Sequence, residues 1–392
     1  MSTKPTARGL AAGAAAVLAA GTLAGFTVTA SAGTGTAAVP AATCGVLFDD
    51  FAYASSSDPS IPARNWTVRT NAGGPGVPGA AWPAANVSFP TEGGQKVLQL
   101  TARTDGTAGG TSHAEFLHQR KFFEGTYAAR VRFTDAPTSG PDGDHLVETF
   151  FTITPLDRPL DPNYGEIDFE YLPNGGWGEQ GPIFYQTTWE TYQNEPWQAD
   201  NTHTAQRTSF NGWHDLTFTV SGGRVRYYVD GVQVADHGDR YYPETPMSIN
   251  FNLWFIDLTG RTGSGLATYI QQVDWLYHTD REVITPAEAR SRVDAYRTAG
   301  TAHVDTVGTG GPCTTTPPTT GPPTTSPTTP PATRPPTTGP PSNCANATAW
   351  DRGAVYLEGD RVTHNGRLWQ ANWWTQGSEP GLTAQWRDLG RC

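Results

Sequence analysis

Positive charge is scarce in this chain of 392 residues, which has 26 Lys and Arg against 37 Asp and Glu and a formal net charge of −11 at pH 7. Such an acidic protein is not expected to bind nucleic acid or anionic lipid. The four cysteines form no CxxC pair and the nine histidines no HExxH spacing, so the common redox and zinc motifs are absent. Only one long apolar run occurs, near the N-terminus, so a membrane is not an expected partner either.

That apolar run extends over residues 10–28 and follows Lys4 and Arg8. Residues 30–32 read ASA, the small residues typical of a signal-peptidase site. A membrane anchor is the alternative, but a run that is rich in Ala and Gly and ends at a cleavage pattern favours a signal peptide over residues 1–32. We therefore expect a secreted, extracellular protein.

The cysteines of an exported protein are expected to form disulfides. Four cysteines allow three pairings. One of them, Cys44 with Cys313 and Cys344 with Cys392, keeps each bridge within one domain, because the first pair brackets most of the chain and the second its last part. This pairing is the expected one.

The segment 314–343 between the two cysteine pairs consists almost entirely of Thr, Pro, Gly and Ser. It lacks the apolar residues that a core needs, so we expect an extended, solvated linker that acts as a passive tether. The linker separates a large domain over residues 33–313 from a small domain over residues 344–392.

The large domain shows the two-residue periodicity of β-strands. Apolar side chains alternate with others along residues 127–133 and along 247–253, and Asp230-Gly231 is a turn dipeptide between two β-rich runs. Many such strands at short spacing predict an all-β fold, a two-sheet β-jelly roll. The segment 285–298 is the exception, because its TPAE start predicts an N-capped helix packed on the sandwich.

Residues 166–170 read EIDFE, with three carboxylates at alternate positions. In a strand, Glu166, Asp168 and Glu170 share one face, while the apolar residues between them face a core. Three adjacent carboxylates repel one another, so a sheet is expected to carry such a row only where it has a use. Hydrolysis of a glycosidic bond fits, because it needs one carboxylate as nucleophile and a second carboxyl as acid and then base. A solvated acidic face and calcium ligation are the alternatives.

The EIDFE stretch resembles the E-x-D-x-E signature of glycoside hydrolase family 16, and the resemblance covers most of residues 48–280. The resemblance implies a concanavalin-like β-sandwich in which Glu166 is the nucleophile, Glu170 the acid/base and Asp168 the assisting residue. One position departs from the family pattern, since Thr188 stands where many members carry Asn. Further matching stretches are ETFFT at 148–152, WHDL at 213–216, YYVDG at 227–231, NLW at 252–254 and VDWLY at 273–277.

The same resemblance predicts which residues line the substrate cleft, next to or across from the acidic strand. Asn252 is favoured because an amide inside a strand must find polar partners. No catalytic cofactor or metal is expected, although many family members bind a structural calcium and Asp274 stands at a matching place. The cleft candidates are Glu148, Trp177, Tyr185, Trp189, Asn252 and Trp254.

The segment 344–392 is small but holds five of the chain's thirteen tryptophans. A disulfide-closed β module of this size needs only one or two of them for packing, so the surplus predicts a surface on which sugar rings stack. The segment resembles the family 5/12 carbohydrate-binding modules, with GDRV at 359–362 and WWTQG at 373–377. The resemblance implies binding to insoluble chitin or cellulose. The binding candidates are Tyr356, Trp369, Trp373 and Trp374, and of the last two only one ring is expected to be exposed.

Three functions fit these features. The first is a monomeric, secreted, retaining endo-β-glycanase that cleaves β-1,3- or mixed β-1,3/1,4-linked glucan of cell walls while the small domain holds it on chitin or cellulose. The second is a chitin-active glycanase or transglycosylase. The signature also exists in a version one residue longer, and the shorter form present here resembles that of fungal-wall transglycosylases, which favours this second function. The third is a lectin-like binding protein. A binding site has no need for two apposed glutamates, so the presence of all three carboxylates argues against the third function.

Overall fold

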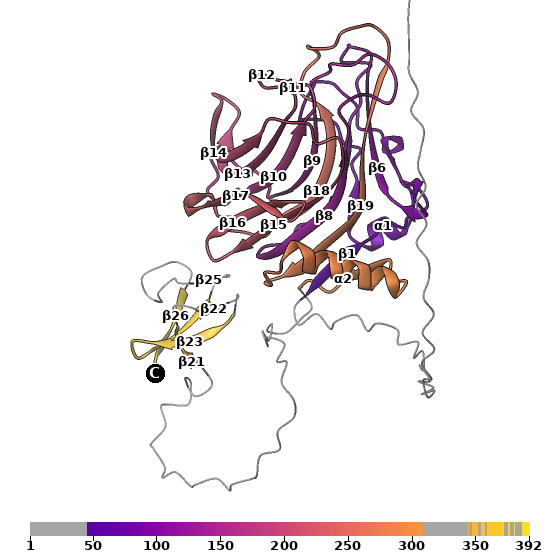
Figure 1. The fold of residues 1–392 in the computed structure, drawn as a ribbon. Coiled ribbons are helices and arrows are strands. Elements are labelled where there is room, and N and C mark those ends of the chain that lie inside the picture. Colours follow the sequence, from indigo (N-terminus) through magenta and orange to yellow (C-terminus); the bar gives the residue numbers. More distant parts are fainter. Residues whose placement is uncertain are drawn as a thin grey trace, which may run out of the picture. The chain divides into compact units, whose positions relative to one another are not determined.

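The computed structural model describes residues 45–308 and, in the C-terminal part, 344, 347–351, 354–356, 359–371, 375–376, 380 and 386–392. The chain divides into two compact units, Met1–Pro317 and Pro318–Cys392, which are coloured along the sequence in Figure 1. Several predicted features lie outside the described residues, namely the signal peptide, the linker, Cys44, Cys313, Trp373 and Trp374. Among the residues that are described, no helix combines the length and apolar character needed to cross a membrane.

One layer of the first unit is a seven-stranded sheet with the strand order β14-β13-β10-β9-β18-β7-β2. All of its neighbouring strands are antiparallel, and β10 lies between β13 and β9. Its strands are β2 (Trp66–Val68), β7 (Ala114–His118), β9 (Leu146–Ile153), β10 (Glu166–Leu172), β13 (Ile183–Gln193), β14 (Gln198–Gln206) and β18 (Ser248–Phe255).

The other layer is a nine-stranded sheet with the path β17-β16-β15-β8-β19-β1-β20, to which β6 and β3 are added beside β19. The predicted turn dipeptide joins β16 to β17, with positive φ angles at Asp230 (+50°) and Gly231 (+81°). The strands are β1 (Val46–Asp49), β3 (Val87–Ser88), β6 (Leu98–Thr104), β8 (Gly125–Phe133), β15 (Gly212–Ser221), β16 (Arg224–Val229), β17 (Val232–Gly238), β19 (Ala267–Asp280) and β20 (His303–Asp305).

Aromatic rings fill the space between the two sheets. Phe150 of β9 stacks on Phe251 of β18 at 5.2 Å between ring centroids, and Phe169 of β10 stacks on Phe184 of β13 at 5.6 Å. From the opposite sheet, Phe218 of β15 lies 5.5 Å from Phe150. These rings are fully buried, and they belong to one large core cluster. The predicted all-β, two-sheet fold is therefore confirmed.

The predicted helix is present as α2 (Pro286–Thr298). The Thr285 hydroxyl accepts a hydrogen bond from the Glu288 amide at 3.1 Å, the N-cap interaction that the sequence predicts. The helix buries Val293 and Tyr296 in a separate small core with residues of β1 and β19 (Figure 1). The remaining elements of the first unit are α1 (Ser60–Ala63), η1 (Ala84–Asn86), η2 (Asp239–Tyr241), β4 (Thr91–Glu92), β5 (Gln95–Lys96), β11 (Gly175–Gly176) and β12 (Glu179–Gln180).

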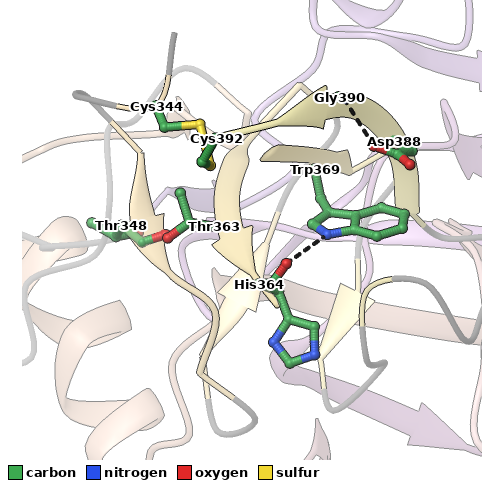
Figure 2. Close-up of a disulfide and its surroundings, with 8 residues drawn as sticks. All are labelled: Cys344, Thr348, Thr363, His364, Trp369, Asp388, Gly390 and Cys392. Atoms are coloured by element: carbon green, nitrogen blue, oxygen red, sulfur yellow. Dashed lines mark hydrogen bonds between the residues drawn. A yellow bond between two sulfur atoms is a disulfide. The ribbon is translucent and has the colours of Figure 1, made fainter. Parts of the chain in front are cut away.

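The second unit contains a four-stranded sheet with the order β21-β23-β24-β26 and a separate β22-β25 pair. A disulfide joins Cys344 to Cys392, with 5.6 Å between their Cα atoms, as the sequence predicts (Figure 2). The described strands are β21 (Thr348–Ala349), β22 (Val355–Tyr356), β23 (Arg361–His364), β24 (Arg367–Ala371), β25 (Thr375–Gln376) and β26 (Trp386–Arg391).

Candidate active site

The three carboxylates of the EIDFE stretch lie on one face of β10. Each of the apolar residues between and after them, Ile167, Phe169 and Tyr171, is fully buried in the core. Asp168 is 2% exposed, whereas Glu166 and Glu170 on either side of it are partly exposed. The outer face of the sheet therefore presents an acidic row whose two end members are only partly exposed.

Each carboxyl of the row receives a hydrogen bond from a different donor. The Tyr164 hydroxyl, two residues before the strand begins, donates to Glu166 Oε2. Trp189 Nε1 of β13 donates to Asp168 Oδ2 at 3.0 Å. Thr187 Oγ1 of the same strand donates to Glu170 Oε2 at 3.3 Å. The last two contacts are diagonal in the strand ladder. Trp189 lies opposite Glu166 and reaches the next carboxylate, Asp168, and Thr187 lies opposite Asp168 and reaches Glu170.

The proton affinities of the three carboxyls differ. Burial raises the pKa of Glu166 to about 7, while hydrogen bonds from Tyr164 and Asp168 oppose the rise. Burial and the charge of Glu166 raise the pKa of Glu170 to about 8. Burial, followed by the charges of both glutamates, raises the pKa of Asp168 well above its usual range. Because the charge of Glu166 raises the pKa of Glu170, ionisation of Glu166 keeps Glu170 protonated, and such a pair suits a nucleophile beside an acid.

Five of the six cleft candidates gather around this row. Asn252 of β18 is buried on the same face, where its side-chain oxygen accepts a hydrogen bond from Thr149 Oγ1 at 2.7 Å. Trp177 is 50% exposed, and its ring lies 6.0 Å from that of Trp254 and 6.4 Å from that of Tyr185. Tyr185 lies directly opposite Glu170 in the ladder. The remaining member of the five is Trp189, which binds Asp168.

Glu148 is the cleft candidate that the structure places on the other face of the sheet. It pairs with the core residue Tyr171, and its carboxylate accepts a hydrogen bond from the Thr134 amide at 3.1 Å. Its side chain is fully buried, and burial raises the pKa of Glu148 well above its usual range. This placement could be predicted from the sequence, since Glu148, Phe150 and Thr152 are spaced two residues apart along β9 and therefore share the inner face.

Other residues on the acidic face are not predicted from the sequence. Glu115 of β7 lies opposite Asn252, and Arg69 forms an ion pair with it at 2.7 Å. The Arg69 guanidinium also lies 3.8 Å from the centre of the Trp82 ring. Trp82 lines a pocket of about 330 Å³. Arg69 and Trp82 are far from the acidic row in the sequence, and only the order of the strands brings them to the same face.

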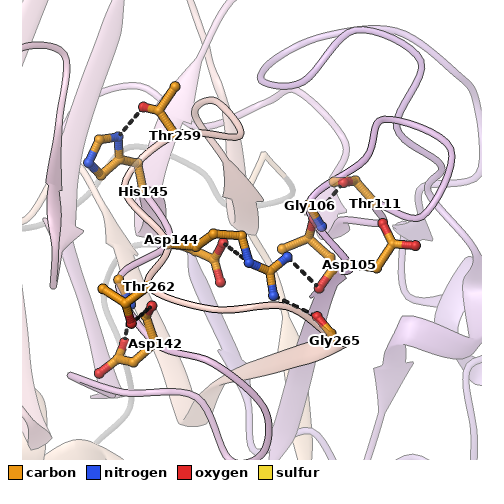
Figure 3. A network of polar contacts seen from close by, with 12 residues as sticks. Asp105, Gly106, Thr111, Asp142, Asp144, His145, Thr259, Thr262 and Gly265 are labelled. Carbon is orange, nitrogen blue, oxygen red and sulfur yellow. Dashed lines mark hydrogen bonds and ion pairs between the residues drawn. The ribbon is translucent and has the colours of Figure 1, made fainter.

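A network of polar contacts fixes the loops next to Trp177. The Arg261 guanidinium group lies 3.6 Å from the Asp144 carboxylate and donates to the carbonyls of Gly265 at 2.6 Å and Thr104 at 3.3 Å. Figure 3 shows Asp144 and Gly265 within this network. The Asn174 amide donates to Asp142 and to the Asp144 carbonyl, which ties the turn before Trp177 to this network. The network therefore holds the loops from which Trp177 extends at the edge of the acidic face.

Asp274 does not have the surroundings of a calcium ligand. Its carboxylate accepts hydrogen bonds from Arg297 at 2.8 and 3.1 Å, and Arg130 lies 3.9 Å away. Two guanidinium groups already neutralise this carboxylate and would repel a cation. In addition, the described residues contain no group of three or more His, Cys, Asp or Glu that could hold a metal ion.

Two binding candidates of the C-terminal unit fall within the described residues. Tyr356 is only 6% exposed, its hydroxyl accepts from the Asp351 amide at 2.6 Å, and its ring packs edge-on against Trp386. Trp369 is partly buried, and its indole donates to the His364 carbonyl at 3.2 Å (Figure 2). Both rings contribute to the small core of this unit.

Comparisons with known proteins found similarity to parts of this chain. Over 43 residues the chain is 51% identical to Chitinase A of Pseudoalteromonas piscicida, and over 44 residues 50% identical to Endoglucanase A of Evansella cellulosilytica. These matches cover 11% of this chain in each case, and only 5% and 9% of the two relatives. Among solved structures, a Bacillus licheniformis β-glucanase is similar with a TM-score of 0.44 and 19% identity, over 60% of this chain and 99% of that one.

Two family models match the chain. The model described as carbohydrate-binding module family 5/12 matches residues 349–387, within the small disulfide-closed unit. The model described as glycosyl hydrolases family 16 matches residues 80–277, about half of the chain, and this stretch includes the whole acidic row. The chain therefore belongs to the glycosyl hydrolases of family 16 and carries a C-terminal carbohydrate-binding module of family 5/12.

Proposed function

We propose that this protein is a secreted, retaining endo-β-glucanase that cleaves β-1,3- or mixed β-1,3/1,4-linked glucan. The observation that carries the proposal is the acidic row, in which two partly exposed glutamates with different proton affinities flank a buried aspartic acid. A lectin needs no such difference, whereas a double displacement needs one ionised and one protonated carboxyl at the same time.

In this mechanism, the ionised Glu166 attacks the anomeric carbon while Glu170 gives its proton to the leaving oxygen. Glu170 then takes a proton from the water that releases the sugar from Glu166. Tyr164 and Asp168 hold the Glu166 carboxylate through hydrogen bonds, which also favour its ionised form. Because Glu166 must be ionised and Glu170 protonated, kcat/KM should rise through a pKa of about 7 and fall through a pKa of about 8.

The surroundings of the row favour a neutral polymer that crosses the face. Three carboxyls and the acidic composition of the chain repel a polyanion. Trp177 and Tyr185 lie beside one end of the row, where their rings can stack on sugar units away from the cleaved bond. The buried Trp254 packs against Trp177. Binding units beyond the reacting one favours cleavage within a chain rather than removal of its last sugar.

The C-terminal module is proposed to hold the enzyme on insoluble chitin or cellulose. This target is supported by the family 5/12 match and by the names of the similar proteins, a chitinase and an endoglucanase. Fungal walls interleave β-glucan with chitin, so a module that binds chitin would keep a glucanase near its substrate. The predicted signal peptide over residues 1–32 supports an extracellular location.

A product profile on laminarin, lichenan, xyloglucan and chitin oligomers tests the catalytic proposal. We expect internal cleavage of laminarin or lichenan, with products that first appear in the anomeric configuration of the substrate. The Glu166→Gln variant is the matched control and should release no products. Cleavage of chitin oligomers alone, or products longer than the substrate, would identify the chitin-active or transferring enzyme instead.

Cleavage of the chain within residues 314–343 tests the anchoring proposal. The catalytic unit should hydrolyse soluble substrate as fast as the full chain does, but it should no longer sediment with insoluble chitin or cellulose. Retention of the truncated enzyme on both polymers would show that binding does not depend on the module.

A further inference from the structure

The strand β13 contains a β-bulge next to the acidic row. Trp189 pairs with Asn201 of β14, but Thr191 already pairs with Asp200, so Glu190 is the extra residue. A bulge shifts the alternation of side chains by one position. Thr191 is therefore turned toward the buried side, and Tyr192 joins Trp189 on the face of the acidic row.

The bulge creates a continuous path of aromatic rings that leads away from the row. The Trp189 and Tyr192 rings lie 5.9 Å apart, and Trp197 lies a further 5.9 Å from Tyr192. Tyr164, the donor to Glu166, packs edge-on against Tyr192 at 5.2 Å. Burial and the charge of Glu166 raise the pKa of Tyr192, which again indicates that this ring lies near the row.

Trp197 lies at the far end of the path and is 65% exposed, although it is the largest apolar side chain available to a protein. Packing of the core does not account for such exposure. The turn that carries Trp197 is held by hydrogen bonds, because Gln193 Nε2 donates to the Pro196 carbonyl and the Leu160 amide donates to the Tyr192 carbonyl, both at 3.0 Å. An exposed indole that packs on Tyr192 and continues the face of the acidic row has the properties of a ligand platform.

We propose that Tyr192 and Trp197 form a platform that binds the sugar rings of a neutral, β-linked polysaccharide beyond the Glu166 side of the cleaved bond. The flat π faces are electronegative and suit the apolar C–H faces of pyranose rings. Asp200 of β14 is paired with Arg240 at 2.6 Å, and this neutralised guanidinium does not favour an anionic polymer. The inference rests on the proposed glucanase function and adds to it a preference for long chains.

Hydrolysis of short and long substrates tests the platform in the full-length enzyme. The probes are laminari- and mixed-linkage oligosaccharides of three and seven units, and the variants are Trp197→Ala, Trp197→Phe and Val232→Ala. Val232 is the matched control because it is also 65% exposed, at the tip of the β16–β17 hairpin. We expect Trp197→Ala to lower the ratio of kcat/KM for the heptamer to that for the trimer about tenfold, which corresponds to about 1.4 kcal/mol. Trp197→Phe should retain most of the ratio, and Val232→Ala should leave it unchanged.

Measurements of binding without hydrolysis distinguish an error in the platform proposal from an error in the proposed glucanase function. The dissociation constants of Glu166→Gln and of Glu166→Gln with Trp197→Ala are measured for laminari-, cello- and chito-heptamers. A weaker affinity of the double variant, by about tenfold for the best-bound heptamer, supports the platform whether or not the wild-type enzyme hydrolyses it. Equal constants in all three series, or no binding by Glu166→Gln, would overturn it. Absence of hydrolysis of every substrate by the wild-type enzyme would instead reject the glucanase function.

Discussion

The two faces of β10 are made by seven consecutive residues, but they have opposite effects on the molecule. On the inner face, Phe169 contacts Phe150, Phe184 and Tyr227, and burial of these rings stabilises the sandwich. On the outer face, burial raises the pKa values of Glu166, Asp168 and Glu170, so it opposes the ionisation that these groups favour in water.

The two faces together explain how β10 can carry an acidic row that destabilises the fold. A raised carboxyl pKa means that the folded protein binds a proton more tightly than the unfolded chain does, so the stability of the fold decreases as the pH rises. The aromatic core behind the same strand offsets this cost. Changes to the outer face should therefore alter activity, and changes to the inner face should alter stability.

The largest separation of the two effects is expected at Glu166. Glutamine keeps the size and an acceptor for the Tyr164 hydroxyl, but it cannot attack the anomeric carbon. Glu166→Gln should therefore lower kcat about 10⁴-fold or more, as removal of a nucleophile does in other enzymes. Urea unfolding should show no loss of stability, and a variant that is active at the wild-type rate would contradict the assigned role.

The opposite result is expected at Phe169, one position before Glu170, the proposed acid/base. Phe169→Ala leaves a cavity between Phe150, Phe184 and Tyr227, and it should reduce the free energy of unfolding by about 3–5 kcal/mol. Urea unfolding followed by circular dichroism measures the loss. Phe169→Leu is the control and should lose clearly less, because it refills most of the cavity. Equal stabilities of Phe169→Ala and the wild type would show that the inner face does not support the strand.

Asp168→Asn should change both properties, in opposite directions. Asparagine keeps an acceptor for the Trp189 indole, but it removes the acidic proton between the glutamates. We expect kcat to fall about 100-fold, within the usual range for a residue that assists proton transfer.

The stability effect of Asp168→Asn has a defined pH dependence. The folded pKa of Asp168 lies well above its unfolded value of about 4, so the wild-type fold loses stability as the pH rises above that value. The variant lacks this titration, and its advantage in melting temperature should be larger at pH 7 than at pH 4. A variant that is less stable than the wild type at pH 7 would mean that the buried aspartic acid stabilises the fold.

Much of this organisation could be predicted from the sequence, because alternation along a strand needs only the order of residues. The acidic row, the buried Ile167 and Phe169 between its members, and the capped helix α2 follow from local patterns. The family resemblance predicts a cleft position for Glu148 and is wrong there, whereas the pattern of its own strand assigns it to the core with Phe150. A two-residue period is a stronger guide to the face of a side chain than proximity to a motif.

Two kinds of feature could not be predicted from the sequence. The first is any contact that depends on strand order, such as Arg69 with Glu115 or Tyr164 with Tyr192. The second is the bulge at Glu190, because a regular period would place Thr191 rather than Tyr192 beside Trp189. Both depend on the pairing of strands, which one strand's own sequence does not contain.

The smallest expected effects concern two neighbouring threonines of β13 that point to opposite faces. Thr188 faces the core, where its hydroxyl lies 2.6 Å from the Tyr227 hydroxyl and 2.9 Å from His237 Nδ1. Thr188→Val should therefore reduce the free energy of unfolding by about 1–3 kcal/mol, because it removes the hydrogen-bond partner of the buried His237 Nδ1 and one of two partners of the Tyr227 hydroxyl. Its pH profile of kcat/KM should match that of the wild type.

Thr187→Val should show the reverse pattern, with a small change in the pH profile and little loss of stability. The Thr187 hydroxyl donates to Glu170 at 3.3 Å and thereby lowers the pKa of Glu170, which burial has raised to about 8. Without this hydrogen bond the pKa of Glu170 rises further, so the acid stays protonated to a higher pH. The alkaline limb of kcat/KM should therefore move up by about 0.7 pH unit, since a hydrogen bond contributes roughly 1 kcal/mol and one unit corresponds to 1.36 kcal/mol. Thr187→Ser keeps the hydroxyl and should restore the wild-type limb. If instead the acidic limb moved, Thr187 would act on the group that must be ionised, and the roles of Glu166 and Glu170 would have to be exchanged.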